Sequence, residues 1–238
     1  EGKDPEQVFR EISEGVFSSP VVLHRVNIQL RFSREEYIRI IEQLKRHILR
    51  GDCYEINFCQ EFYAREAIID PLNIYKKLSS VSPNPFSALY RLEDKWLICA
   101  SPERFLRRQG NSVLSQPIKG TSGRVKQDQV KDQQSRDALQ QSAKDRSENV
   151  MVVDLVRNDL ARICEEGTVK VDELFGLYSF PQVHQMISTI SGEIRKDISF
   201  AEIIRATFPM GSMTGAPKKR VMELIEEYEK TRRGIFSG

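Results

Sequence analysis

The chain has 238 residues, with 36 basic and 34 acidic side chains and a formal net charge of +2. Charges are spread along the chain without a basic block, which argues against a nucleic-acid-binding surface. No apolar run approaches the roughly 18–20 residues that cross a membrane, and no secretory signal opens the sequence. The length suits one large domain with a substantial core.

The cysteines are scattered and form no C-x-x-C pair. This spacing favours reduced thiols, as in cytoplasmic proteins, over a disulfide framework or a zinc site. The sequence starts at Glu1 without methionine and ends abruptly at Gly238. We therefore expect a piece of a longer protein, with a lead-in segment at residues 1–20 that carries one short helix and a main domain at residues 21–238.

Partial alternation predicts a strand at residues 21–32. Ser33 and Glu36 form a capping-box pattern ahead of apolar residues at helical spacing, which predicts a helix that stops at Gly51. Residues 53–63 are typical of a strand, with Glu55 on one face and Gln60 on the other, otherwise apolar face. A buried amide needs partners, so Gln60 is either a core residue bonded to backbone or a site residue.

Asp70-Pro71 predicts the start of a helix that runs to about Ser80. Two hairpins should follow, at residues 86–100 and 105–115. The second hairpin would bring Glu103 and Lys119, at its two outer ends, close together. Such an acid and lysine form either a surface ion pair or a reactive pair.

Lys119 lies in the stretch Pro117-Ile118-Lys119-Gly120-Thr121. Glycine lets a backbone approach a ligand, and a lysine that loses solvent there can become a neutral nucleophile. Taken alone, the stretch is more typical of a loop glycine beside a solvated lysine, and only the rest of the chain favours the reactive lysine.

A polar, mobile loop is predicted at residues 121–135, followed by one helix at residues 135–161. Asp145 and Glu148 would share a face of that helix, where they suit either a hard divalent cation or plain solvent. Arg157-Asn158-Asp159 follows a buried apolar run, which favours a structural ion-pair network.

Residues 183–194 resemble a strand, with His184 near its start as either a core residue or a site residue. The Gly-rich stretch at residues 208–218 precedes a helix at residues 217–230 and offers backbone donors to an anion. Its candidate contacts are Gly211, Thr214 and Gly215. The spacing is not that of a Walker loop.

Together and in this order, several strings resemble the chorismate-utilising enzyme family. They are Gly51-Asp52-Cys53-Tyr54 with Asn57 and Gln60, Ser101-Pro102-Glu103-Arg104-Phe105, the Lys119 stretch, Ala143-Lys144-Asp145-Arg146 with Glu148-Asn149, the run from Val153 to Leu160, and Gly211 to Lys218. The resemblance covers residues 21–238 and implies a chorismate-binding catalytic domain. It also implies an α+β, anthranilate-synthase-like fold of stacked, largely antiparallel sheets flanked by helices.

Within that family, lysine at position 119 is typical of the aminodeoxychorismate synthases, whereas anthranilate synthases carry alanine there. Gln60 is matched to the position where isochorismate synthases carry a lysine base. The resemblance therefore implies component I of aminodeoxychorismate synthase, which makes 4-amino-4-deoxychorismate for p-aminobenzoate and folate. Anthranilate synthase component I and a non-catalytic subunit that docks an amidotransferase are the alternatives.

The resemblance also assigns roles. Glu103 would be the general acid at the C4 hydroxyl, and Lys119 would attack ring carbon C2 before ammonia enters at C4. Mg²⁺ would be held by Glu148, with Asp145 behind it, while the substrate would contact Gln60, Gly120, Thr121, His184 and the loop at residues 211–215. A glutamine amidotransferase partner would supply the ammonia. The family's further arginine and second magnesium glutamate are absent from this chain, so we expect a C-terminal truncation.

Overall fold

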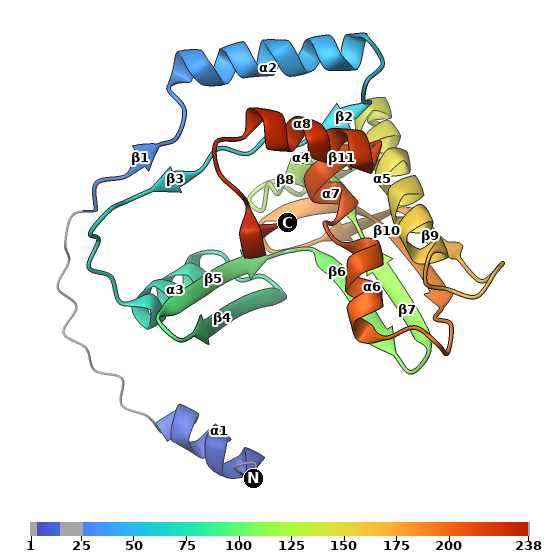
Figure 1. Ribbon diagram of the computed structural model, residues 1–238. Helices are drawn as coiled ribbons and strands as arrows, with labels where there is room; N and C mark the ends of the chain where they lie inside the picture. Colours follow the sequence, from blue (N-terminus) through green and yellow to red (C-terminus); the bar gives the residue numbers. More distant parts are fainter. Residues whose placement is uncertain (1–3, 15–25, 238) are drawn as a thin grey trace. The chain divides into compact units, whose positions relative to one another are not determined.

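The computed structural model describes residues 4–14 and 26–237 and separates into two compact units (Figure 1). The first unit comprises Glu1–Ile28 and Ala64–Ala100, and the second comprises Gln29–Tyr63 and Ser101–Gly238. Every candidate site residue lies in the second unit. No described helix is both long and apolar enough to cross a membrane.

The first unit combines two helices and a hairpin. Its helices are α1 (Pro5–Glu14) and α3 (Pro71–Val81), and its strands are β4 (Phe86–Leu92) and β5 (Lys95–Ser101), which pair with each other. Asp70 caps α3 because its carboxylate accepts hydrogen bonds from the backbone N–H groups of Leu72 and Asn73, at 3.0 and 3.1 Å. The sequence-based helix and hairpin are both confirmed here.

A five-stranded antiparallel sheet forms the centre of the second unit. Its strands are β6 (Arg104–Gln109), β7 (Ser112–Gln116), β8 (Ile118–Gly123), β9 (Lys170–Ser179) and β10 (Val183–Glu193). The strand β10 pairs with β9 along one edge, while β8 and β7 share its other edge. Pro117 separates β7 from β8, and its carbonyl accepts the N–H of Ser188 at 3.2 Å. Lys119 therefore follows a break in an otherwise continuous sheet edge.

Two helices, α4 (Gln129–Gln141) and α5 (Ala143–Ala161), pack against β8 and β10, and α6 (Phe200–Thr207) packs against α5. Part of the predicted apolar run of α5 supplies the main core, although Val150 at its start is 41 % exposed and Asp154 within it is exposed. Its buried members include Val152, Val156 and Leu160, together with Val113 of β7, Ile190 of β10 and Ile203 of α6. This core anchors the sheet to α5, so it fixes the elements that carry the site.

Two sequence-based boundaries in this region are wrong. The expected mobile loop at residues 121–135 is mostly ordered, because β8 continues to Gly123 and α4 begins at Gln129. The expected single helix at residues 135–161 is divided at Ser142, whose extended backbone (φ −64°, ψ 107°) ends α4. The Ser142 hydroxyl accepts the N–H of Asp145 at 3.2 Å and so begins α5.

A second, smaller core joins α2 (Arg34–Leu49) to α8 (Lys218–Tyr228) through Leu44, Cys53, Val221 and Leu224. The predicted capping box of Ser33 and Glu36 is present at the start of α2. The remaining elements are short: β1 (Gln29–Leu30), β2 (Glu55–Ile56), β3 (Phe62–Tyr63), α7 (Gly211–Thr214), β11 (Gly215–Ala216) and the 3₁₀ turn Gly234–Phe236.

The predicted strands at residues 21–32 and 53–63 are therefore much shorter than expected. Residues 21–25 lie outside the described part of the chain, and only Gln29–Leu30 is extended in the rest of the first segment. In the second segment, residues 57–61 leave the strand. The pairing of β2 with β11 uses only two residues of each strand, and β1 with β3 likewise.

Candidate functional site

Lys119 lies on β8 and forms an ion pair with Glu55 of β2. The distance between Lys119 Nζ and Glu55 Oε1 is 3.0 Å, and the two side chains are only 16 % and 13 % exposed. That oxygen of Glu55 is buried, and no described residue forms a hydrogen bond with it, so its contact with Lys119 is an ion pair. Lys119 is thus a largely desolvated lysine whose direct ionic partner, among residues 4–14 and 26–237, is the carboxylate of Glu55, and the solvated loop position is excluded.

Glu103 lies just before β6, beside the same lysine. Burial raises the pKa of the Glu103 carboxyl above its ordinary value, although hydrogen bonds from Ser212 and from the backbone of Ile118, and the charge of Lys119, act in the opposite direction. The predicted meeting of Glu103 and Lys119 across the second hairpin is confirmed. Its consequence is a carboxylic acid that holds its proton more tightly than usual next to a lysine.

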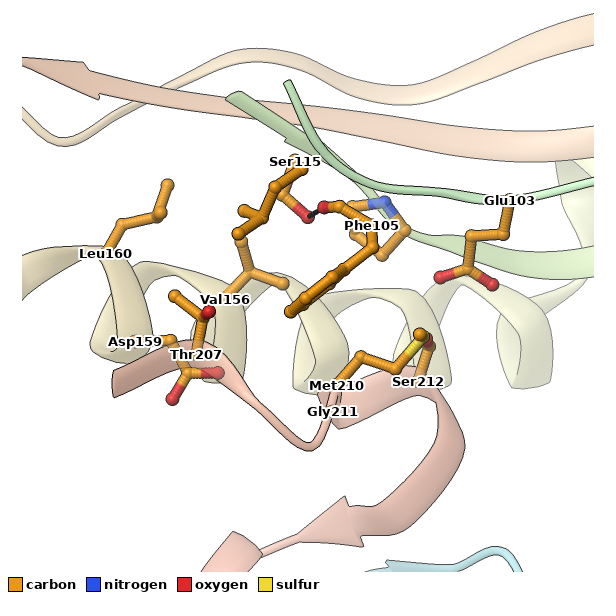
Figure 2. Close-up of a pocket in the computed structure, with 12 residues that line it drawn as sticks. Glu103, Phe105, Ser115, Val156, Asp159, Leu160, Thr207, Met210, Gly211 and Ser212 are labelled. Carbon is orange, nitrogen blue, oxygen red and sulfur yellow. Dashed lines mark hydrogen bonds between the residues drawn. The ribbon is translucent and has the colours of Figure 1, made fainter. Parts of the chain in front are cut away.

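A small cavity of about 20 Å³ lies beside Glu103, between the sheet and α5. Figure 2 shows Glu103 at one end of the residues that line it and Asp159 with Thr207 at the other. Such a volume holds about one water molecule. The apolar walls, which include Phe105, Pro117 and Met210, account for the desolvation of Glu103.

The turn between α7 and β11 adjoins these residues. Gly215 has φ +135°, and a Cβ there would lie 2.2 Å from the backbone oxygen of Glu55. The Thr214 hydroxyl is buried and donates to the carbonyl of Met210 at 3.2 Å. Gly211 packs against Leu155, so a Cβ added at Gly211 would lie 2.9 Å from Cδ1 of Leu155. These contacts place the loop next to Glu55 and Leu155, and a substrate contact by the loop remains a prediction.

The anion site predicted at the start of α8 has a lysine, Lys218, in the first turn of that helix. Lys218 Nζ donates to Asp159 Oδ2 at 2.5 Å and to the carbonyl of Thr207 at 3.1 Å. Asp159 is therefore paired, as the sequence suggested for the polar residues after the apolar run. Arg157, in contrast, lies at the surface and pairs with Asp154 at 2.9 Å.

Gly120 brings β8 close to α5. Its φ of +96° favours glycine, and a Cβ there would lie 3.0 Å from the Cβ of Asp145. Asn149, one turn further along α5, donates from Nδ2 to the carbonyl of Lys119 at 3.4 Å. Thr121 is exposed and lies opposite Gln185 of β10. The backbone on both sides of Lys119 is thus held by α5 and by the sheet.

Asp145 and Glu148 lie three residues apart on α5, as predicted. Both are half-buried, and Glu148 is 3.6 Å from Lys144. Among the described residues, no group of three or more His, Cys, Asp or Glu side chains suits a metal ion. Mg²⁺ commonly takes one or two carboxylates and completes its six ligands with substrate oxygens and water. Two carboxylates on this helix fit that kind of binding.

His184 is buried, with 2 % of its surface exposed, and both ring nitrogens have partners. Nδ1 lies 2.8 Å from the Ser179 hydroxyl, and Nε2 lies 3.3 Å from Asp132 Oδ1. Arg124 Nε also donates to both oxygens of Asp132, at 2.9 and 3.0 Å. These bonds tie β10, β9 and α4 together, and direct substrate contact by His184 remains a prediction.

We predict a pH-dependent loss of stability from Asp132. The Arg124 guanidinium, helped by the N–H of Val125, lowers the pKa of the Asp132 carboxyl to about 2. Because the pKa is lower in the folded state, ionised Asp132 stabilises the fold fully at pH values above about 3.9, the ordinary pKa in the unfolded chain. This stabilisation is lost as the pH falls through the folded-state pKa of about 2. Asp132→Asn should lower the melting temperature at pH 7, and the difference from wild type should shrink progressively below about pH 4. A difference that stays constant down to pH 2 would contradict this origin.

Gln60 lies in a separate groove of about 390 Å³ formed by α2 and the β1–β3 pair. Its neighbours there include Phe32, Tyr37 and Phe62, and no described residue forms a hydrogen bond with its buried Oε1. Glu55, and not Gln60, is the residue of this segment that faces Lys119. A contact between Gln60 and substrate remains a prediction.

Residues 12–238 match the family described as chorismate binding enzyme. The chain belongs to this family. Aminodeoxychorismate synthase component 1 of Escherichia coli is 40 % identical over 210 residues, which are 88 % of this chain and 46 % of that protein. The Bacillus subtilis protein of the same name is 36 % identical over 87 % of this chain and 44 % of that protein. An anthranilate synthase component I-like protein of Synechocystis is 35 % identical, over 93 % of this chain and 45 % of that protein.

A solved structure agrees with this chain on the fold. Anthranilate synthase component I from Streptococcus pneumoniae superposes with a TM-score of 0.82 at 26 % identity. The matched region is 98 % of this chain and 52 % of that chain. The predicted α+β, anthranilate-synthase-like fold with largely antiparallel sheets is thus confirmed. The chain spans about half the length of the curated relatives described above.

Sequence reasoning missed two residues of the site, Glu55 and Ser212. Glu55 was assigned to a strand face, but its partner Lys119 lies in a distant part of the sequence. The only local signal was a lone carboxylate between Tyr54 and Ile56, which indicates a charge held against an apolar surface. Ser212 lies in the Gly-rich stretch, and its role as a hydrogen-bond partner of Glu103 is visible only in the folded chain, where α7 lies beside Glu103.

Proposed function

We propose that the full-length protein is the chorismate-converting component of aminodeoxychorismate synthase. The reaction replaces the C4 hydroxyl of chorismate by an amino group to give 4-amino-4-deoxychorismate. The observation that carries this proposal is the desolvated Lys119 beside Glu103, whose pKa is raised by burial. The relatives at 40 and 36 % identity that bear this name support it.

The two residues divide the work of a substitution at an unreactive hydroxyl. Glu103 in its neutral form donates a proton to the leaving oxygen, because hydroxide itself leaves poorly. Lys119 attacks ring carbon C2 through its neutral amine and forms a covalent intermediate. Ammonia then bonds to C4, and the C2–N bond to lysine breaks. Two successive displacements let ammonia arrive on the face that the hydroxyl left.

Mg²⁺ is proposed as the cofactor, held by Glu148 with Asp145 behind it on α5. The bound ion would neutralise the ring carboxylate of the substrate. The contribution of this chain is to keep both carboxylates on one helix turn, next to Gly120 and the lysine strand. Gly120 lets the strand approach that helix without a side chain between them.

The wider setting is also a proposal. The words component 1 in the relatives' names support a partner subunit, which we take to be a glutamine amidotransferase that delivers ammonia. The product would serve p-aminobenzoate and folate synthesis. Four free cysteines are consistent with a reducing, cytoplasmic compartment.

Product analysis of the full-length protein tests this function. With chorismate, Mg²⁺ and ammonium at alkaline pH, we expect 4-amino-4-deoxychorismate, identified by mass and by conversion to p-aminobenzoate with an added lyase. The Synechocystis relative keeps anthranilate synthesis as a second candidate. Fluorescent o-aminobenzoate as the main product would favour that candidate and refute ours.

A further inference from the structure

The ion pair between Lys119 and Glu55 is built by elements that meet only in the folded chain. The strand β2 holds Glu55 through its pairing with β11, in which Ala216 lies opposite Glu55. The N–H of Tyr54, the residue before Glu55, donates to the carbonyl of Ala216 at 2.7 Å and so fixes the backbone at the start of β2. The strand β8 brings Lys119 from the other side, to 3.0 Å between Nζ and Oε1. Neither carboxylate nor ammonium depends on a flexible surface loop.

The two carboxyl groups around Lys119 differ in their surroundings. Burial raises the pKa of Glu103, which favours its neutral acid form. Glu55 makes the direct ion pair with the ammonium. One carboxylate balances the ammonium of Lys119, so a second ionised carboxylate would leave an uncompensated charge in a poorly solvated place.

This arrangement raises a chemical requirement. A protonated lysine has no lone pair, so it must lose a proton before Nζ attacks carbon. Glu103 is not the acceptor, because it must keep its own proton for the leaving hydroxyl. The oxygen nearest to take the proton is Oε1 of Glu55, which forms an ion pair with Nζ at 3.0 Å and has no hydrogen-bond partner among the described residues.

We infer that Glu55 is the general base that takes the proton of Lys119 and so turns this lysine into the nucleophile. The inference rests on the proposed function and assigns a third residue to it. The first step converts Lys119–NH₃⁺ and Glu55–COO⁻ into Lys119–NH₂ and Glu55–COOH. The amine lone pair then forms the C2–N bond, both conjugated ring double bonds shift by one position, and the C4–O bond breaks.

The remaining protons balance. The proton of Glu103 leaves with the C4 oxygen as water, and Glu103 becomes a carboxylate. Ammonia forms the C4–N bond, both ring double bonds shift back, and the electrons of the C2–N bond return to Lys119 as a neutral amine. The new C4 ammonium gives one proton to Glu103, and Glu55–COOH returns its proton to Lys119. Both carboxyl groups end in their starting forms.

The test uses full-length protein and the variants Glu55→Gln and Glu55→Asp. Wild type and variants are mixed with chorismate and Mg²⁺ without ammonia and quenched at intervals, and the Lys119 peptide is followed by mass spectrometry. Glu55→Gln should form the adduct on the order of 10²–10³-fold more slowly, a typical size for general-base catalysis, with KM for chorismate nearly unchanged. Glu55→Asp should retain part of the rate because it keeps a carboxylate.

The pH profile separates proton transfer from mere positioning. In Glu55→Gln the lysine must lose its proton to solvent, so adduct formation should rise about tenfold per pH unit, while wild type stays flatter. The other acids near Lys119 are Glu103 and, on α5, Asp145 next to Gly120, and both are retained in the variant. Glu42→Gln is the matched control, because Glu42 makes a 2.7 Å ion pair with Lys45 on the exposed face of α2.

The outcomes are distinct. Slow adduct formation with a steeper pH profile in Glu55→Gln, and wild-type behaviour in Glu42→Gln, supports the inference. An adduct that forms in Glu55→Gln at the wild-type rate and with the wild-type pH profile overturns it and leaves the proposed function standing. An equal slowing at every pH assigns Glu55 to positioning and also overturns it. No adduct in wild type overturns the covalent route and, with it, the role of Glu55.

Discussion

Replacing Lys119 with alanine is expected to abolish 4-amino-4-deoxychorismate formation by the full-length protein, with a loss on the order of 10³-fold or more. The reason is that the variant lacks the only atom in our proposed route that forms the bond to C2. Alanine also leaves Glu55 without its cation, 3.0 Å away in wild type. Steady-state kinetics with saturating ammonium measure the effect.

Lys119→Arg is the matched control for this prediction. Arginine keeps a positive charge next to Glu55 but remains protonated, so it cannot act as the nucleophile. Both variants should be inactive, and Lys119→Arg should melt closer to wild type than Lys119→Ala. Substantial turnover by Lys119→Arg would mean that position 119 supplies only charge, which would exclude a covalent lysine intermediate.

Features governed by neighbouring residues were predictable from the sequence. The helix α2 begins where the capping box of Ser33 and Glu36 places it, because both hydrogen bonds lie within one turn. The approach of Glu103 to Lys119 also followed from a local element, since a hairpin brings its ends together. Local signals thus located the acid and the lysine, together with the strands that hold them.

Features that depend on distant partners were not predictable in the same way. The polar segment from residue 121 to 135 gave no apolar pattern, yet Arg124 and Asp132 pair there and organise the start of α4 around His184. The partner of Lys119 is a residue on β2, which becomes its neighbour only through the β2–β11 pairing. No local periodicity encodes that contact.

The division of α4 from α5 illustrates a third case. Residues on both sides of Ser142 favour helix, so periodicity continues through the break. The hydroxyl of Ser142 competes with the backbone by accepting the N–H of Asp145, which starts a new helix in a new direction. This turn places Asp145 against Gly120, so a single cap determines where the proposed magnesium carboxylates meet the lysine strand.

Gly215 should be the glycine whose replacement has the largest effect on the fold of this site. In Gly215→Ala the new Cβ would lie 2.2 Å from the backbone oxygen of Glu55 and 3.0 Å from the Cα of Ile56, at φ +135°. The backbone of β2 must move or the β2–β11 pairing must break, which should cost roughly 3 kcal/mol or more. Thermal or urea denaturation of the full-length protein measures the loss.

Gly110→Ala is the control that separates steric overlap from backbone strain. Gly110 also has a positive φ, +62°, but a Cβ there meets nothing within 4 Å, so only the strain of about 1–2 kcal/mol is expected. Because Gly215 supports the strand that carries Glu55, Gly215→Ala should also slow adduct formation on Lys119 in the fraction that remains folded. Equal destabilisation by the two substitutions would show that the close approach of β11 to Glu55 does not hold β2 in place.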